Sequence, residues 1–162
     1  MTPNKSLQVS RDCSALKFKD KIHLEGCSRG HLNPKRLEIV HLMHRTGVRL
    51  LAGTDILNPY VYPGFSLHDE LELLVEAGLS PLAALQTATI NPAKFLGQEK
   101  VIGTVERGKL ADLVLLEANP LENISHTQRI NAVVVNGRYL PQETLRKLLA
   151  EVEATANRAK PR

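Results

Sequence analysis

The spacing of apolar residues first indicates a helix and then a short strand. Helical spacing begins at Asn33-Pro34 and ends at Gly47. Proline suits the first turn of a helix, and glycine suits the position just past its end. The next residues, 48–52, form a short apolar run between two glycines, which is typical of a buried parallel strand. The order helix, glycine, strand therefore predicts an αβ unit.

Three further helices are predicted after this unit. The first begins at a capping box, Ser66 to Asp69, and ends at Gly78. Ser80-Pro81 begins the second helix, and Asn91-Pro92 begins a short third one. The region that follows the predicted strand is thus helical.

Beyond these helices the pattern becomes extended. Residues 113–116 and 132–135 are continuous apolar runs, each short enough for one strand. The second run ends in Asn136-Gly137, the favoured pair of a type I′ turn. We therefore expect a hairpin that returns through residues 138–140.

These changes of pattern divide the chain into four regions. Residues 1–34 are poorly patterned, apart from a weak predicted strand at 16–24. Residues 35–100 hold the strand and the helices, and residues 101–140 hold the later strands. Residues 141–162 return to helical spacing, with an apolar stripe that we expect to dock on the body of the domain. The pattern as a whole predicts an α/β protein.

The composition excludes several classes of protein. The 162 residues are 43% hydrophobic and 23% charged, which excludes a wholly disordered, collagen-like or disulfide-scaffold chain. The net charge of +4 is spread along the sequence, and three Tyr and three Phe offer few rings for stacking on bases. Nucleic-acid binding is therefore not expected.

The sequence also argues for a cytoplasmic protein. No run of residues approaches the ~18 apolar residues of a membrane span, and no signal-peptide pattern follows Met1. Cys13 and Cys27 lack the spacing of a zinc knuckle or a disulfide framework. We therefore expect two reduced thiols, no membrane partner and a cytoplasmic location.

The most informative motif is Gly53-Thr54-Asp55, at the carboxyl end of the predicted 48–52 strand. In an α/β barrel, side chains at that end of a strand point into the mouth of the active site. Asp55 is therefore placed for metal or proton chemistry. The alternative is that Asp55 only caps the turn that follows.

Six further motifs follow Gly-Thr-Asp in order, in residues 63–71, 76–85, 88–93, 103–114, 119–121 and 135–137. Together they closely resemble the C-terminal part of the amidohydrolase superfamily, in its imidazolonepropionase-like and Xaa-Pro dipeptidase-like branch. The run Gly-Lys-Leu-Ala-Asp-Leu-Val makes the resemblance specific. It covers roughly residues 35–140.

The resemblance implies a metal-dependent hydrolase that cleaves C–N bonds of a small amide, cyclic amide or dipeptide. Its fold would be the last part of a (β/α)8 barrel (TIM barrel), with the C-terminal strands of a small composite β-sandwich. Asp55 matches the family's last-strand aspartate, which contacts a divalent metal, zinc in our expectation, and takes a proton from the metal-bound water. His68 is a candidate for the substrate side of the site. The alternative for His68 is a polar residue in the first turn of its helix.

The chain departs from the family pattern upstream of this motif. The His-x-His pair of the first strand and the ligands of the middle strands should precede Gly53, yet only 52 residues do. His41 and His44 share a helix that we expect outside the barrel. Because a catalytic zinc typically needs three protein ligands, Asp55 alone cannot hold one. We therefore expect a truncated C-terminal half with an incomplete barrel, no tight metal binding and no activity by itself.

Two other interpretations remain open. The chain would be an inactive remnant that acts as an oligomerising or interaction module, or one half of a split enzyme. Strands near 111–117 and 131–140 would leave a bare sheet edge, which residues 1–24 or another chain would cover. The expected partners are thus a small-molecule substrate and a second copy or complementary chain.

Two residues of the later region have expected structural roles. Asp112 is predicted to be a structural hydrogen-bonding residue. Lys109 is predicted to be a solvated turn residue.

Overall fold

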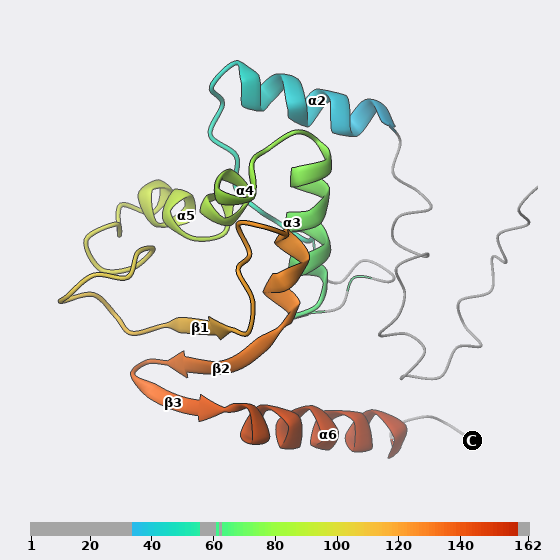
Figure 1. The fold of residues 1–162 in the computed structure, drawn as a ribbon, viewed down its shortest axis with the longest axis vertical. Helices are drawn as coiled ribbons and strands as arrows, with labels where there is room; N and C mark the ends of the chain where they lie inside the picture. Colours follow the sequence, from blue (N-terminus) through green and yellow to red (C-terminus); the bar gives the residue numbers. More distant parts are fainter. Residues whose placement is uncertain (1–33, 56–60, 62, 159–162) are drawn as a thin grey trace, which may run out of the picture. The chain divides into compact units, whose positions relative to one another are not determined.

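The computed structural model describes residues 34–55, 61 and 63–158. Helices and a three-stranded sheet make up the described chain (Figure 1). The weak strand predicted at 16–24 lies outside the described residues. The elements in chain order are α2 (Pro34–Arg45), α3 (Ser66–Glu76), α4 (Pro81–Thr87), α5 (Ile90–Phe95), β1 (Leu113–Leu116), the 3-10 helix η3 (Ile124–Gln128), β2 (Ile130–Val135), β3 (Arg138–Pro141) and α6 (Gln142–Arg158).

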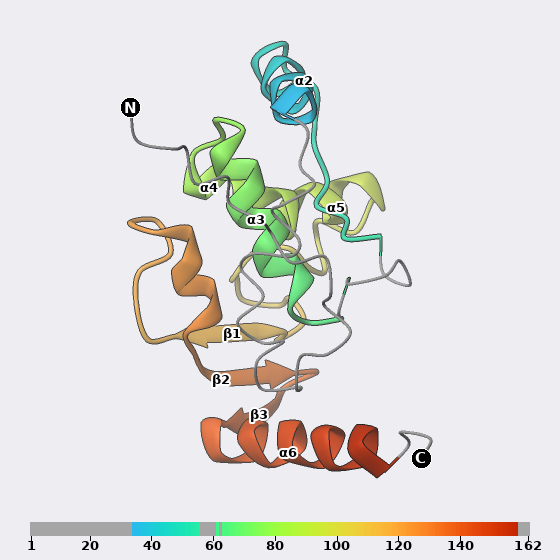
Figure 2. The same ribbon diagram turned by 90° about the vertical axis from the view of Figure 1, so that its right-hand side faces the viewer.

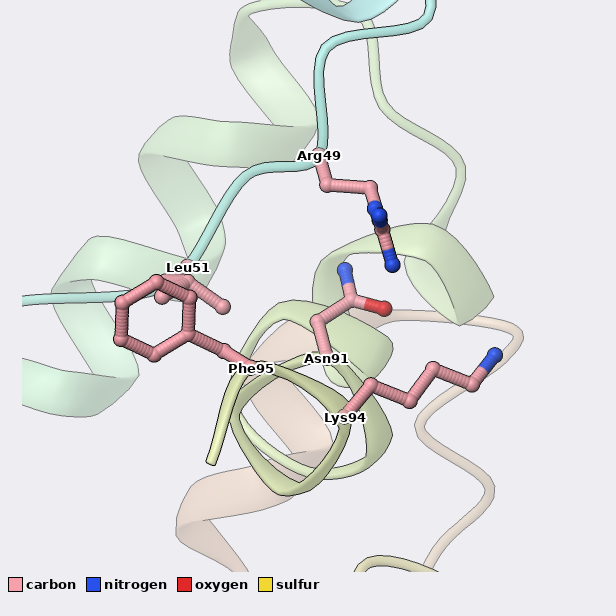
Figure 3. A pocket seen from close by; sticks show the side chains of 5 residues that line it. All are labelled: Arg49, Leu51, Asn91, Lys94 and Phe95. Carbon is pink, nitrogen blue, oxygen red and sulfur yellow. The ribbon is translucent and has the colours of Figure 1, made fainter. Parts of the chain in front are cut away.

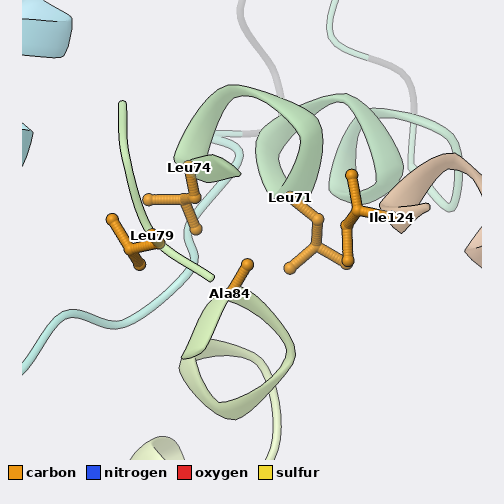
Figure 4. Packing of buried hydrophobic residues seen from close by; sticks show 5 residues of the cluster. All are labelled: Leu71, Leu74, Leu79, Ala84 and Ile124. Atoms are coloured by element: carbon orange, nitrogen blue, oxygen red, sulfur yellow. The ribbon is translucent and has the colours of Figure 1, made fainter. Parts of the chain in front are cut away.

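The core lies between α3, α4 and η3. Leu71 and Leu74 of α3 are one helical turn apart, and both are buried. Figure 4 shows them packed with three further side chains, Leu79, Ala84 and Ile124. The side chains of Leu50 and Ala52 pack against this cluster from the segment that precedes Asp55.

The prediction of a buried parallel strand at 48–52 is wrong. The segment is not a strand, and Val48 and Leu51 are 45% and 42% exposed. A strand forms only by pairing with a neighbour, and no strand in the described part of the chain pairs with this segment. Helices hold it instead, through a 3.0 Å hydrogen bond from the Ala52 amide to the Thr87 carbonyl.

The helix ends follow the sequence signals in one case and not in another. Ser80 caps α4, because its hydroxyl accepts a hydrogen bond from the Ala83 amide at 3.2 Å. The capping box predicted at Ser66 is wrong. Phe65 takes the N-cap position with helical dihedrals and makes no side-chain cap hydrogen bond, so Ser66 is already inside α3. The Phe65 carbonyl there accepts a 3.0 Å hydrogen bond from the His68 amide.

The three strands form an antiparallel sheet in the order β1-β2-β3 (Figures 1 and 2). The predicted hairpin is confirmed, with Val135 paired to Arg138. Asn136 and Gly137 both have positive φ, 48° and 77°, as a type I′ turn requires. The Asn136 amide donates a hydrogen bond to the carboxylate of Asp112, so the structural role predicted for Asp112 is confirmed.

Helix α6 contacts β2 and β3, and both views show it beside β3 (Figures 1 and 2). Its predicted apolar stripe, Leu145, Leu148, Leu149 and Val152, docks only in part, because Leu145 alone of these four is half-buried. Leu148, Leu149 and Val152 are exposed, because the short strands β2 and β3 contact only part of this long helix. None of the described helices combines the length and the apolar character needed to cross a bilayer.

Candidate active site

Asp55 is the last described residue of the segment that follows α2 and contains residues 48–52. Its φ is 49°, in the left-handed region, and its side chain is exposed. Aspartate and asparagine are among the few residues other than glycine that adopt this conformation without a large cost. The carboxylate therefore lies at the surface.

Glu70 of α3 interacts with the backbone at Gly53, and the sequence analysis missed it. The Gly53 backbone amide favours the charged form of the Glu70 carboxylate. Burial raises the pKa of Glu70, and the Gly53 amide partly opposes that shift. Its position in the helix could have identified Glu70 from the sequence. Glu70 lies one helical turn before the buried Leu74 and is therefore on the inner side of α3.

His68 makes a structural contact with η3. Its Nδ1 lies 3.0 Å from the hydroxyl of Thr127, and that hydroxyl donates its only proton to the Ile124 carbonyl at 2.9 Å. The Nδ1–H of His68 must therefore be the donor to Thr127, which leaves Nε2 as the acceptor in the neutral ring. This contact fits the structural alternative for His68, and its substrate-side position stays a prediction.

The state of His68 makes stability depend on pH. Burial lowers the pKa of His68, partly offset by the charges of Asp69 and Glu72. The unfolded chain therefore binds the proton more tightly, and the free energy of unfolding should fall as the pH drops through the ordinary histidine value of 6.5. Urea unfolding at about pH 7.5 and about pH 5.5 measures this loss, within the range where histidine titrates.

His68→Gln is the matched control for that measurement. The variant keeps a donor for Thr127 but has no titrating ring, so it should lose less stability over the same range. Glu70 acts in the opposite direction, because its raised pKa means that protonation favours the folded chain. Glu70 is present in both proteins and cancels in the comparison. Equal losses in the two proteins would contradict the role given to His68.

The described residues do not fit a catalytic metal. In the ranges 34–55 and 63–158, no three His, Cys, Asp or Glu side chains lie together as a metal would need. His41 is engaged elsewhere, since its Nδ1 donates to the Ala77 carbonyl at 2.9 Å. Cys13 and Cys27 lie outside the described residues, as do His23 and His31.

The prediction that Lys109 is a solvated turn residue is wrong. Its side chain is only 10% exposed, and its Nζ lies 3.4 Å from Glu106 Oε2 and donates to the hydroxyl of Thr104. The turn folds these three residues onto one another, so the ammonium is covered although the sequence around it is polar. The hydroxyl of Thr104 and then the charge of Lys109 lower the pKa of Glu106.

Comparison with known proteins decides the family. The sequence model described as "Amidohydrolase family" matches residues 7–140. The chain belongs to the amidohydrolase family. The predicted resemblance is therefore confirmed, and amidohydrolases are generally metal-dependent hydrolases with an α/β fold.

Three similar proteins illustrate the relationship. The chain is 37% identical to an ochratoxinase of Aspergillus niger over 91 residues, which are 55% of this chain and 18% of that protein. It is 33% identical to an imidazolonepropionase of Symbiobacterium thermophilum over 105 residues, 62% of this chain and 24% of that one. The crystal structure of a Xaa-Pro dipeptidase with methionine bound in its active site matches with a TM-score of 0.60 and 30% identity, over 69% of this chain and 27% of that chain.

The chain thus spans about a fifth to a quarter of the length of these amidohydrolases. The residues that the family model matches include Gly53-Thr54-Asp55.

Proposed function

We propose that this chain supplies Asp55 as the proton-transferring carboxylate of a hydrolase that cleaves C–N bonds in a small amide, cyclic amide or dipeptide. The observation that carries the proposal is the backbone and exposure of Asp55 in the Gly-Thr-Asp motif. Asp55 has an exposed side chain on a left-handed backbone, two residues after Gly53, whose amide interacts with Glu70 of α3. Membership of the amidohydrolase family gives this motif its context.

The proposed chemistry is a proton transfer between water and the leaving nitrogen. As the oxygen of a water molecule attacks the carbonyl carbon, the Asp55 carboxylate takes one of its protons. When the C–N bond breaks, the same proton passes to the nitrogen, so that acid and amine products form and the carboxylate is restored. Asp55 would have to lie within hydrogen-bond reach of that water in the substrate complex.

Because the family is generally metal-dependent, the proposal also requires metal ligands that the described residues do not supply. A divalent ion such as zinc activates water in such enzymes when it is bound. Asp55 has no group of ligands around it in the described ranges, so the other ligands would come from a complementary chain. The proposed partners are accordingly the small-molecule substrate and that complementary chain.

We expect the isolated chain to bind no stoichiometric zinc. The physical reason is that a single carboxylate offers far fewer than the three protein ligands that a catalytic zinc requires. Elemental analysis after dialysis against zinc-containing buffer, and then against metal-free buffer, measures the content. Roughly one zinc per chain would contradict this expectation and show that the chain completes a site by itself.

The test of the proposed function is complementation. The chain is assayed alone and together with the upstream barrel segment of a related amidohydrolase, on an Xaa-Pro dipeptide, a cyclic amide and an imidazolone. Hydrolysis that requires both polypeptides supports the proposal. Absence of hydrolysis, with zinc bound to the upstream segment, would contradict it.

The second candidate is an inactive module that associates with another copy or another chain. The specific observation in its favour is the exposed apolar surface of α6, where Leu148, Leu149 and Val152 face solvent. Strand β1 is also an edge of the sheet as described, with open backbone groups. Self-association without hydrolysis in the complementation assay would favour this candidate.

A further inference from the structure

A second candidate site lies between the extended segment and α5. Arg49 and Leu51 from the segment, and Asn91, Lys94 and Phe95 from α5, line a pocket of about 360 Å³ (Figure 3). None of these residues belongs to the Gly-Thr-Asp motif, so the pocket is separate from the proposed hydrolytic residue.

The local structure places these five side chains together. Arg49 and Leu51 alternate with Leu50 and Ala52, which pack against the core cluster, so the first pair faces away from it. On α5, residues 91, 94 and 95 have the spacing of one helix face. The side-chain amide of Asn91 donates to the Leu50 carbonyl at 3.0 Å and fastens the two walls of the pocket together.

The pocket has a cationic part and an apolar part. Figure 3 shows the Arg49 guanidinium and the extended Lys94 side chain on one side of Asn91, with Leu51 and Phe95 on the other. Within the part of the chain that the structure describes, neither cation forms an ion pair with an Asp or Glu side chain. Phe95 is 77% exposed, so a ligand could cover much of its ring.

We propose that this pocket binds a small organic carboxylate with an aromatic or branched apolar body. A guanidinium matches a carboxylate with two parallel hydrogen bonds, and the Lys94 ammonium adds a second charge. The apolar body removes Leu51 and Phe95 from water. The volume lies within the ~300–1,000 Å³ range of small-molecule pockets. A bare anion would meet the two charges but leave the apolar wall in water.

Benzoate titration of the full chain tests this proposal, followed by amide chemical shifts. Benzamide is the neutral control of nearly the same shape, and acetate is the control without an apolar body. We expect benzoate to bind at least ~10-fold more tightly than either, because each control loses one of the two kinds of contact.

Single substitutions then assign the contacts. Arg49→Gln and Lys94→Gln should each weaken benzoate binding by about tenfold, since each removes a charge-assisted hydrogen bond. Phe95→Ala should weaken benzoate binding but leave acetate binding unchanged. Lys100→Gln is the matched control, because Lys100 is an exposed lysine beyond α5 that does not line the pocket.

All three substituted side chains are exposed, so the variants should keep the fold, and circular dichroism checks this. Equal binding of benzoate and benzamide would overturn the proposal, because the cations would then contribute nothing. Unchanged benzoate affinity in both Arg49→Gln and Lys94→Gln would overturn it as well. None of these outcomes depends on hydrolysis, so the proposal stands or falls separately from the proposed function.

Discussion

Replacing Asp55 by asparagine should lower C–N hydrolysis by the complemented protein by about 10² or more, the usual effect of losing a positioned acid–base group. Asparagine has nearly the same shape but cannot accept the proton from the attacking water. It also tolerates the left-handed backbone that Asp55 adopts, so the turn itself should be preserved. The measurement is kcat/KM for Asp55→Asn and for the unchanged chain, each with the same upstream segment.

Glu99→Gln is the control for that experiment, because it neutralises another exposed carboxylate well away from the motif in sequence. It should leave kcat/KM unchanged. A loss of less than a few fold in Asp55→Asn would contradict the catalytic assignment. If Asp55→Asn instead unfolds the isolated chain, then the turn-capping alternative is correct.

The second large effect concerns stability, and its site is Gly103. This glycine has a φ of +97°, and a Cβ placed on it would lie 2.7 Å from the Ala93 Cβ and 3.1 Å from the Ile90 Cα. A left-handed backbone costs an alanine about 1–2 kcal/mol, and overpacking against a rigid helix adds roughly 1–3 kcal/mol. We expect Gly103→Ala to lower the free energy of unfolding by both amounts.

Gly108→Ala separates the two contributions. Gly108 has a nearly equal φ of +88°, but a Cβ there would meet nothing within 4 Å. Its substitution should therefore show only the backbone cost of about 1–2 kcal/mol. Urea unfolding of both variants measures the difference. Equal losses would show that α5 moves aside freely at Ile90 and Ala93.

Local signals in the sequence predicted much of this fold. The Asn136-Gly137 hairpin and the Ser80 cap follow the sequence because the interactions that form them join residues only a few positions apart. The prediction of a strand at 48–52 failed because a strand needs a partner that a local pattern does not reveal. The docking predicted for the apolar stripe of α6 was largely wrong for the same reason, since periodicity identifies an apolar face but not what covers it.

The candidate site was predictable to a smaller extent. Gly53-Thr54-Asp55 stands out because a family motif marks it, and the family is confirmed. Glu70 was missed because its contact with Gly53 spans two elements and looks, in sequence, like one more acid in a helix. Whether Asp55 and His68 act on a substrate stays a prediction, because the carboxylate needs groups beyond the described residues to complete a site.

The hydrogen bond from His41 to Ala77 has a consequence for how α2 opens. None of the α2 residues is fully buried, although Val40 packs against the core cluster. The imidazole occupies the space that a side chain at Gly78 would fill, since a Cβ there would lie 2.5 Å from Nδ1. The His41 ring over Gly78 therefore holds α2 to the end of α3, together with the contact of Val40 with the core. Amide hydrogens of α2 should exchange with solvent when the His41–Ala77 hydrogen bond opens locally. Those of α3 should exchange much later, because their exchange requires disruption of the core.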